Sequence, residues 1–186
     1  CKSSQAVSVV APVTGNGLCN FTQKRGGVPV NGTVWIEGQS YALDRCVGGL
    51  DYTSGILARH TCWRWGSLNG RAADGSLIGV NLVEGFNEGP HSNENTLWVN
   101  GKAFPLPRAR FFRNRNAEGD LWRIEGPKLA IEFRVFAEHR EEKNLGFARS
   151  RFLQQIGRFT GDLAVDGKNY SLQEMVGVIE DQDVHW

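Results

Sequence analysis

The sequence predicts an all-β protein whose antiparallel strands form a barrel or a strongly bent sandwich, with little or no helix. Glycine is abundant, at 23 of 186 residues, and most segments between glycines are short and alternate apolar with polar residues; this pattern is typical of strands. Dipeptides that favour tight hairpins recur, such as Asn-Gly at 69–70 and Asp-Gly at 74–75. Gly157 and Gly161 interrupt one long strand-like segment. Because glycine suits the bends at barrel corners, we favour the barrel.

In the first half of the chain, short alternating segments are separated by Gly, Asn and Asp turn residues. Segment 48–55 contains the turn formers Asp51 and Ser54, so we expect it to be irregular. The long segment 56–65 is expected to pair with segment 77–84 through a hairpin. The strands expected in this half are residues 6–12, 21–25, 33–37, 41–43, 56–65, 77–84 and 95–99.

The second half contains the clearest strand pattern, at 129–137. There Ile131 and Phe133 face one way while Glu132 and Arg134 face the other, which is typical of a half-buried antiparallel strand. The charged segment that follows, 139–144, is expected to form a loop with at most one helical turn. The strands expected in this half are residues 102–106, 109–113, 121–125, 129–137, 147–165, 170–174 and 176–180.

Composition argues against several classes of function. The chain has 21 basic and 20 acidic residues, without the sustained basic surface of a nucleic-acid-binding protein. The arginines at 108–115 are interpreted as a solvated loop. The chain has no apolar run long enough to span a membrane. It also lacks metal-ligand spacings, phosphate-binding glycine loops and nucleophile elbows. We therefore expect neither a metal nor a cofactor, and Cys62, inside a strand, is expected to be a small buried residue.

The length predicts one domain, residues 1–186. The chain begins with Cys rather than Met, so we expect a processed form or a fragment. No signal segment is visible, and three Asn-X-Ser/Thr triplets carry little weight as evidence of secretion. The compartment stays open, with the cytoplasm favoured.

A first candidate site lies on segment 59–65. Alternation places Arg59, Thr61, Trp63 and Trp65 on one face of this strand. If that face points into the barrel, the tryptophans form the aromatic wall of a small-molecule pocket and Arg59 orients the ligand. In the competing interpretation, the tryptophans are core residues whose indole N–H groups bond to the backbone.

A second group of polar residues lies within apolar segments: Asn81, Glu94 and Asn95, with Trp98 on the face of Glu94. Burial beside tryptophan disfavours the charged form of a carboxylate, which would suit Glu94 as a catalytic acid or base, with Asn81 or Asn95 as an orienting donor. The competing interpretation is that these residues only stabilise turns.

Several segments together resemble the family called domain of unknown function 2804, nearly end to end and in the same order. The segments are FTQKR at 21–25, LDYTSG at 50–55, RHTCWRW at 59–65, GVNLV at 79–83, ENTLWVNG at 94–101, QIGRFTG at 155–161 and GVIE at 177–180, closing at Trp186. Family members are usually longer, so the resemblance implies that this chain is the C-terminal half of a two-domain protein. It also implies a lipocalin-like (calycin) fold, similar to that of carotenoid hydratases and tocopherol cyclases.

Three functions follow as hypotheses. The first is a lipocalin-like module that binds a small, largely apolar ligand in the barrel. It would use Trp63, Trp65 and Trp98 as walls, with Arg59, Asn81, Asn95 and Glu94 as polar contacts. The second is a cofactor-free cyclase, hydratase or isomerase with Glu94 as the proton donor. The third is a structural half-domain that packs against a missing N-terminal half and binds no ligand. The family itself supplies no catalytic residue.

Overall fold

The computed structural model describes residues 4–13, 18–89, 93–115 and 119–186. The regular secondary structure in these ranges consists of strands alone, which confirms the all-β prediction. None of the described residues belongs to a helix that could cross a membrane. The strands are β1 (Val7–Pro12), β2 (Cys19–Val30), β3 (Thr33–Ile36), β4 (Gln39–Ala42), β5 (Cys46–Gly55), β6 (His60–Arg71), β7 (Leu77–Glu84), β8 (Thr96–Val99), β9 (Lys102–Pro105), β10 (Arg110–Asn114), β11 (Leu121–Gly126), β12 (Leu129–Asn144), β13 (Arg149–Val165) and β14 (Lys168–His185).

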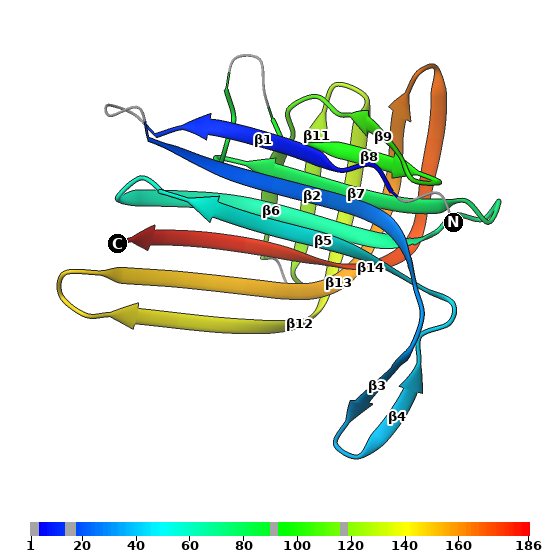
Figure 1. The fold of residues 1–186 in the computed structure, drawn as a ribbon, viewed down its shortest axis with the longest axis horizontal. Helices are drawn as coiled ribbons and strands as arrows, with labels where there is room; N and C mark the ends of the chain where they lie inside the picture. The colour runs from blue at the N-terminus through cyan, green and yellow to red at the C-terminus, as the bar shows by residue number, and fades with distance from the viewer. Residues whose placement is uncertain (1–3, 14–17, 90–92, 116–118) are drawn as a thin grey trace.

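The strands form one large sheet, one small sheet and a hairpin (Figure 1). The large sheet has nine antiparallel strands in the order β10-β11-β12-β13-β14-β6-β7-β8-β9. The small sheet, in the order β1-β2-β5, lies across the large one, where β2 and β5 contact β6 and β7. The β3–β4 hairpin extends away from both sheets (Figure 1).

The large sheet curls into a half-barrel because its longest strands bend. The register shifts between Val135 and Ala137 where β12 pairs with β13, and between Phe159 and Gly161 where β13 pairs with β14; such bulges bend strands. At Gly157, a Cβ atom would lie 2.2 Å from the carbonyl oxygen of Arg134. Only glycine allows this close approach, so the glycines of β13 do mark the bend, as predicted.

The curl brings the β10 end of the sheet next to β6 and β7. Glu84, the last residue of β7, accepts a hydrogen bond of 3.0 Å from the backbone N–H of Phe111 and one of 2.9 Å from Arg110. Arg64 on β6 donates to the carbonyl oxygen of Phe111 at 3.2 Å. Side chains of β6 and β7 therefore hold β10 by hydrogen bonds to its backbone, in place of strand pairing between β10 and β7.

Apolar side chains fill the inner face of the curl. Residues from near both ends of the sheet belong to this core, such as Phe111 of β10 and Leu97 of β8. The largest fully buried members include Trp122, Phe133, Phe159, Ile124, Leu97 and Ile179. A half-barrel filled in this way has a packed interior.

The small sheet covers the other face of β6, β7 and β8. Alternation places Leu68 and Val80 in the core, so their neighbours Asn69 and Gly79 face the small sheet. Asn69 accepts a hydrogen bond of 2.8 Å from the backbone N–H of Gly27 on β2. A Cβ atom on Gly79 would lie 2.3 Å from that same nitrogen. The two sheets are therefore in backbone contact at this point.

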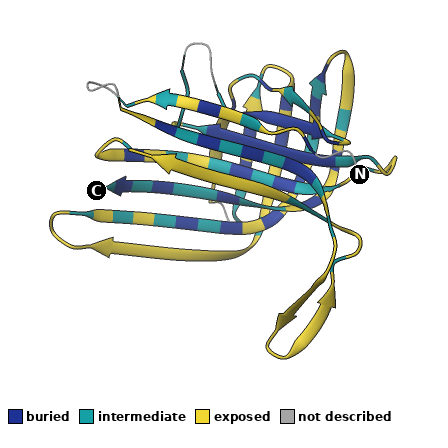
Figure 2. Ribbon diagram, viewed as in Figure 1, coloured by how far each residue is buried: buried dark blue, intermediate teal, exposed yellow. Residues whose placement is uncertain are grey.

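Several expected element boundaries were wrong. Residues 46–55, expected to be irregular from 48 onward, form β5, and residues 139–144, expected to be a loop, extend β12. The dipeptide at 69–70 lies within β6, and the turn comes at 74–75. The two strands expected at 170–180 are one strand, β14. Figure 2 shows the outer half of β12 and the β3–β4 hairpin exposed to solvent.

Candidate functional site: an aromatic pocket between the sheets

A pocket of about 300 Å³ lies between the two sheets, where β5 forms the free edge of the small sheet. Its walls come from β2, β5, β6, β7 and β14 and from residues on either side of strands. The pocket lies on the face of the large sheet opposite the hydrophobic core. It combines an aromatic wall with four ionisable side chains.

The aromatic wall is built on β6. Trp63 and Trp65 share the face that the small sheet partly covers, and both are half-buried. Phe86, which follows β7, packs against Trp63 with ring centroids 5.7 Å apart. Trp186 also lines the pocket. Four aromatic side chains thus supply large apolar contact area, each with an electron-rich π face.

Both indole N–H groups on this wall have side-chain acceptors. Trp65 donates to the Asn81 side-chain oxygen at 2.7 Å, and Asn81 in turn donates to the carbonyl oxygen of Glu94 at 3.0 Å. Trp63 donates to Glu180 of β14 at 3.3 Å. The competing expectation, in which the indoles bond to the backbone, does not hold for Trp63 or Trp65. These bonds fix the orientation of the rings that face the pocket.

Glu94, Lys24 and Asp51 form an ionic cluster that is buried at Glu94 and Lys24 and exposed at Asp51. The Lys24 ammonium lies 2.5 Å from an Asp51 oxygen and 3.3 Å from Oε2 of Glu94. The side chains of Lys24 and Glu94 are only 7% and 1% exposed, whereas Asp51 is 40% exposed. Lys24 also lies 5.8 Å from the ring centroid of Trp65. Pairing of this kind is what makes a buried charge tolerable.

The two oxygens of Glu94 have different surroundings. Oε1 accepts hydrogen bonds of 2.7 Å from the Thr22 hydroxyl and 2.7 Å from the Asn87 amide. Oε2 is fully buried, and no hydrogen bond from the described residues reaches it; the Lys24 ammonium lies near it without hydrogen-bond geometry. A buried acceptor without a hydrogen bond is costly. The ion pair with Lys24 offsets this cost for Oε2.

Glu180, which lines the pocket from β14, is held by neutral donors. Its Oε2 accepts from the Trp63 indole, and its Oε1 accepts from the Gln154 side chain at 3.0 Å. Among the described residues, no cation forms an ion pair with it. The carboxylate therefore has a fixed position and an uncompensated charge.

The predicted site residues divide into three groups. Glu94, Trp63 and Trp65 lie together on the pocket. Asn81 and Trp98 line a smaller cavity of about 100 Å³, which Lys24, Asp51 and Trp65 also line. Trp98 donates its indole N–H to the carbonyl oxygen of Gln5 at 2.8 Å.

The remaining two predicted residues do not line the pocket. Asn95 is buried, accepts a hydrogen bond from the Val83 N–H at 2.6 Å and donates to the Pro107 carbonyl at 3.0 Å, so it holds backbone segments together. Arg59 is exposed and donates to the carbonyl oxygen of Phe147 at 3.4 Å.

Sequence reasoning missed Lys24, Asp51, Phe86, Glu180 and Trp186 as pocket residues. The signal for Lys24 was weak but present: Thr22 and Lys24 lie two residues apart, so they share a face of β2. Thr22 is 72 positions from its partner Glu94, and nothing local links them.

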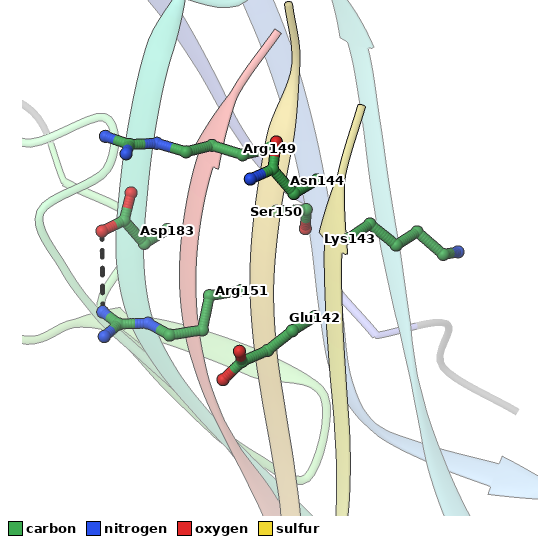
Figure 3. A pocket seen from close by; sticks show the side chains of 7 residues that line it. All are labelled: Glu142, Lys143, Asn144, Arg149, Ser150, Arg151 and Asp183. Atoms are coloured by element: carbon green, nitrogen blue, oxygen red, sulfur yellow. Dashed lines mark ion pairs between the residues drawn. The ribbon is translucent and has the colours of Figure 1, made fainter. Parts of the chain in front are cut away.

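A second hollow, of about 360 Å³, lies between the ends of β12, β13 and β14 and is lined by polar and charged side chains (Figure 3). The guanidinium groups of Arg149 and Arg151 lie on either side of the Asp183 carboxylate, and Arg151 pairs with it at 3.5 Å. A hydrogen bond from His60 helps hold the pKa of Asp183 below its usual value. The apolar walls of a typical small-molecule site are missing here.

His60, Asp183 and His185 are the described residues whose placement could hold a metal ion. The two imidazole rings are stacked, with centroids 3.8 Å apart and planes at 13°. Nearly parallel rings do not direct their lone pairs at one point. Arg149 also donates to Nδ1 of His185, and desolvation together with the positive charges nearby lowers the pKa of this histidine. We assign no metal to this cluster.

Comparisons with known proteins identify the family. A search of the curated proteins and one of the solved structures give no match. The expected kinship with lipocalin-like proteins and the expected N-terminal half before this chain stay predictions. The sequence matches the family described as a domain of unknown function, DUF2804, over residues 1–186. With that match over its whole length, the chain belongs to the DUF2804 family.

Proposed function

We propose that this protein binds a small, largely apolar ligand in the pocket between its two sheets. The observation that supports this most directly is the combination of four aromatic side chains with fixed charged groups, namely Glu180 and the Lys24–Asp51–Glu94 cluster. Ligand sites typically join apolar walls to a few fixed polar groups in this way.

The contacts of Glu94 favour binding over the cyclase, hydratase or isomerase hypothesis. Its Oε1 accepts two hydrogen bonds, and its Oε2 lies beside an ammonium group. Both oxygens therefore face donor groups of the protein, an arrangement that suits a side chain that accepts hydrogen bonds. Glu94 then serves to orient a bound molecule.

Two measurements test the binding function. Native mass spectrometry of freshly purified protein should show an excess mass that is lost on denaturation. Titration with Nile red, a neutral apolar dye, should show saturable fluorescence enhancement. Because Thr53 lines the pocket and its neighbour Ser54 faces away on the same exposed strand, Thr53→Phe should abolish dye binding and Ser54→Phe should leave it unchanged.

Equal dye binding by Thr53→Phe, Ser54→Phe and the unmodified protein would contradict the proposed site. Circular dichroism and thermal melts of both variants establish that they are folded. Both positions are exposed on β5, so the substitutions enter solvent-accessible space and are not expected to disturb the core.

A further inference from the structure

The charges in the pocket are unbalanced, and this bears on the kind of ligand that it takes. Four ionisable side chains line it: Lys24, Asp51, Glu94 and Glu180. One is a cation and three are carboxylates. The ammonium of Lys24 is shared between Asp51 and Glu94. The pocket therefore has an excess of negative charge before a ligand arrives.

Glu180 is the carboxylate best placed to meet a ligand. It is half-buried, and its hydrogen-bond donors, Trp63 and Gln154, are neutral. Within the described parts of the chain it has no ion-pair partner. A carboxylate in such partly desolvated surroundings interacts more strongly with a cation than a fully solvated one does. An anionic ligand at the same place would be repelled.

The aromatic wall adds to this preference. A cation within about 6 Å of the centroid of a Trp or Phe ring is attracted by the electron-rich face. The pocket already holds one such contact, because the Lys24 ammonium lies 5.8 Å from the centroid of Trp65. Trp63, whose indole N–H is bonded to Glu180, places a second aromatic ring beside the unpaired carboxylate.

We propose that the ligand of this pocket is an organic cation: an amine or quaternary ammonium group carried on an apolar body. The cationic group pairs with Glu180 against the tryptophan faces, and the apolar body lies along Phe86 and Trp186. This inference rests on the proposed binding function and specifies the chemical class of its ligand.

The test compares three compounds that share one apolar skeleton and differ in charge: 4-phenylbutylamine, 4-phenylbutanol and 4-phenylbutyrate. Isothermal titration calorimetry at neutral pH and low salt gives the dissociation constant of each. We expect the amine to bind about tenfold or more tighter than the alcohol, from an ion pair combined with a cation–π contact. The carboxylate should bind most weakly, and salt should reduce the advantage of the amine.

Glu180→Gln should remove most of the preference for the amine while leaving the affinity for the alcohol unchanged. The matched control is Asp181→Asn, which removes the same charge from the next residue of β14, on the opposite face of the strand and outside this pocket. It should keep the preference. Loss of the preference in both variants would indicate a general effect of net charge and would overturn the assignment to Glu180.

Equal affinities for the amine and the alcohol would overturn the inference, as would a preference for the carboxylate. If Nile red still binds in that case, and Thr53→Phe abolishes its binding, the proposed binding function remains valid. If neither the dye nor any of the three compounds binds, the proposed function itself fails. The two failures are therefore distinguishable.

Discussion

Lys24 and Glu94 form an ion pair in the interior of the protein, with the ammonium nitrogen 3.3 Å from Oε2 of Glu94. The pair joins β2 of the small sheet to the residue that precedes β8 by two positions. It therefore holds the two sheets together at the wall of the pocket. Removing one partner has a different energetic cost from removing the other, because Lys24 also forms an ion pair with Asp51.

Lys24→Met should destabilise the protein more than Glu94→Gln does. Removing the ammonium leaves the Glu94 charge buried without a cation, and breaking a buried pair in this way costs about 3–5 kcal/mol. Glu94→Gln keeps an acceptor for Thr22 and leaves Lys24 paired with Asp51, so it should cost about 1–3 kcal/mol. Chemical denaturation measures both free energies of unfolding. The reverse order would contradict the burial and pairing described for this cluster.

Alternation along 59–65 predicted one face of β6 correctly. Thr61 is buried and both tryptophans are half-buried, while His60 and Arg64 on the other face are exposed. The same period-2 argument could not say which side of the sheet was the core. That depends on how the sheet curls, and the curl places the tryptophans outside the half-barrel and under the small sheet.

The predictions for two segments were wrong for the same reason: strand pairing overrides local propensity. Residues 46–55 contain Gly48, Gly49 and Asp51, yet they pair with β2 along almost their whole length. Residues 139–144 show no apolar face because the outer half of β12 is exposed on both sides and charged. Charged residues are a common protection for such strand edges. The ionic cluster could not be predicted, since its members come together only through the packing of the sheets.

Gly79→Ala should be strongly destabilising because β2 and β7 are in backbone contact. The added Cβ would lie 2.3 Å from the nitrogen of Gly27 and 2.5 Å from the carbonyl carbon of Gly26. Neither atom can move without separating the sheets, so we expect a loss of about 3 kcal/mol or more. The control is Gly66→Ala on β6, where the closest atom is on the Phe111 side chain at 3.4 Å. Thermal melts should show a much smaller loss for the control.

The expectation that Cys62 is buried was wrong. Cys62 is exposed on β6, on the face away from the tryptophans. Its thiol should therefore react in the folded protein. Titration with Ellman's reagent under native conditions should give one reactive thiol fewer for Cys62→Ser than for the unmodified protein. The two proteins would give equal counts if Cys62 were protected by the fold.

Asp120 should make the stability of the fold sensitive to acid. Its carboxylate accepts hydrogen bonds from the Arg113 guanidinium, whose Nε lies 2.8 and 3.0 Å from the two oxygens. It also accepts a hydrogen bond of 2.7 Å from the Gln155 side chain. The hydrogen bonds from Arg113 hold the pKa of Asp120 below its usual value of 3.8, and the bond from Gln155 adds to this. Gln155 is fully buried and also accepts from the Trp122 indole at 2.7 Å, so the network connects the ion pair to the core.

The lowered pKa of Asp120 determines how pH changes the stability of the fold. Because the pKa is lower in the folded state than in the unfolded chain, the folded state binds fewer protons between the two values. The stabilising contribution of Asp120 is then fully present above the unfolded pKa and is lost as the pH falls through the folded one. Denaturation midpoints measured from pH 6 down to pH 2 should fall less steeply for Asp120→Asn than for the unmodified protein. Parallel curves for the two proteins would show that protonation of Asp120 is not coupled to folding, and the ion pair with Arg113 would then contribute nothing to the acid sensitivity.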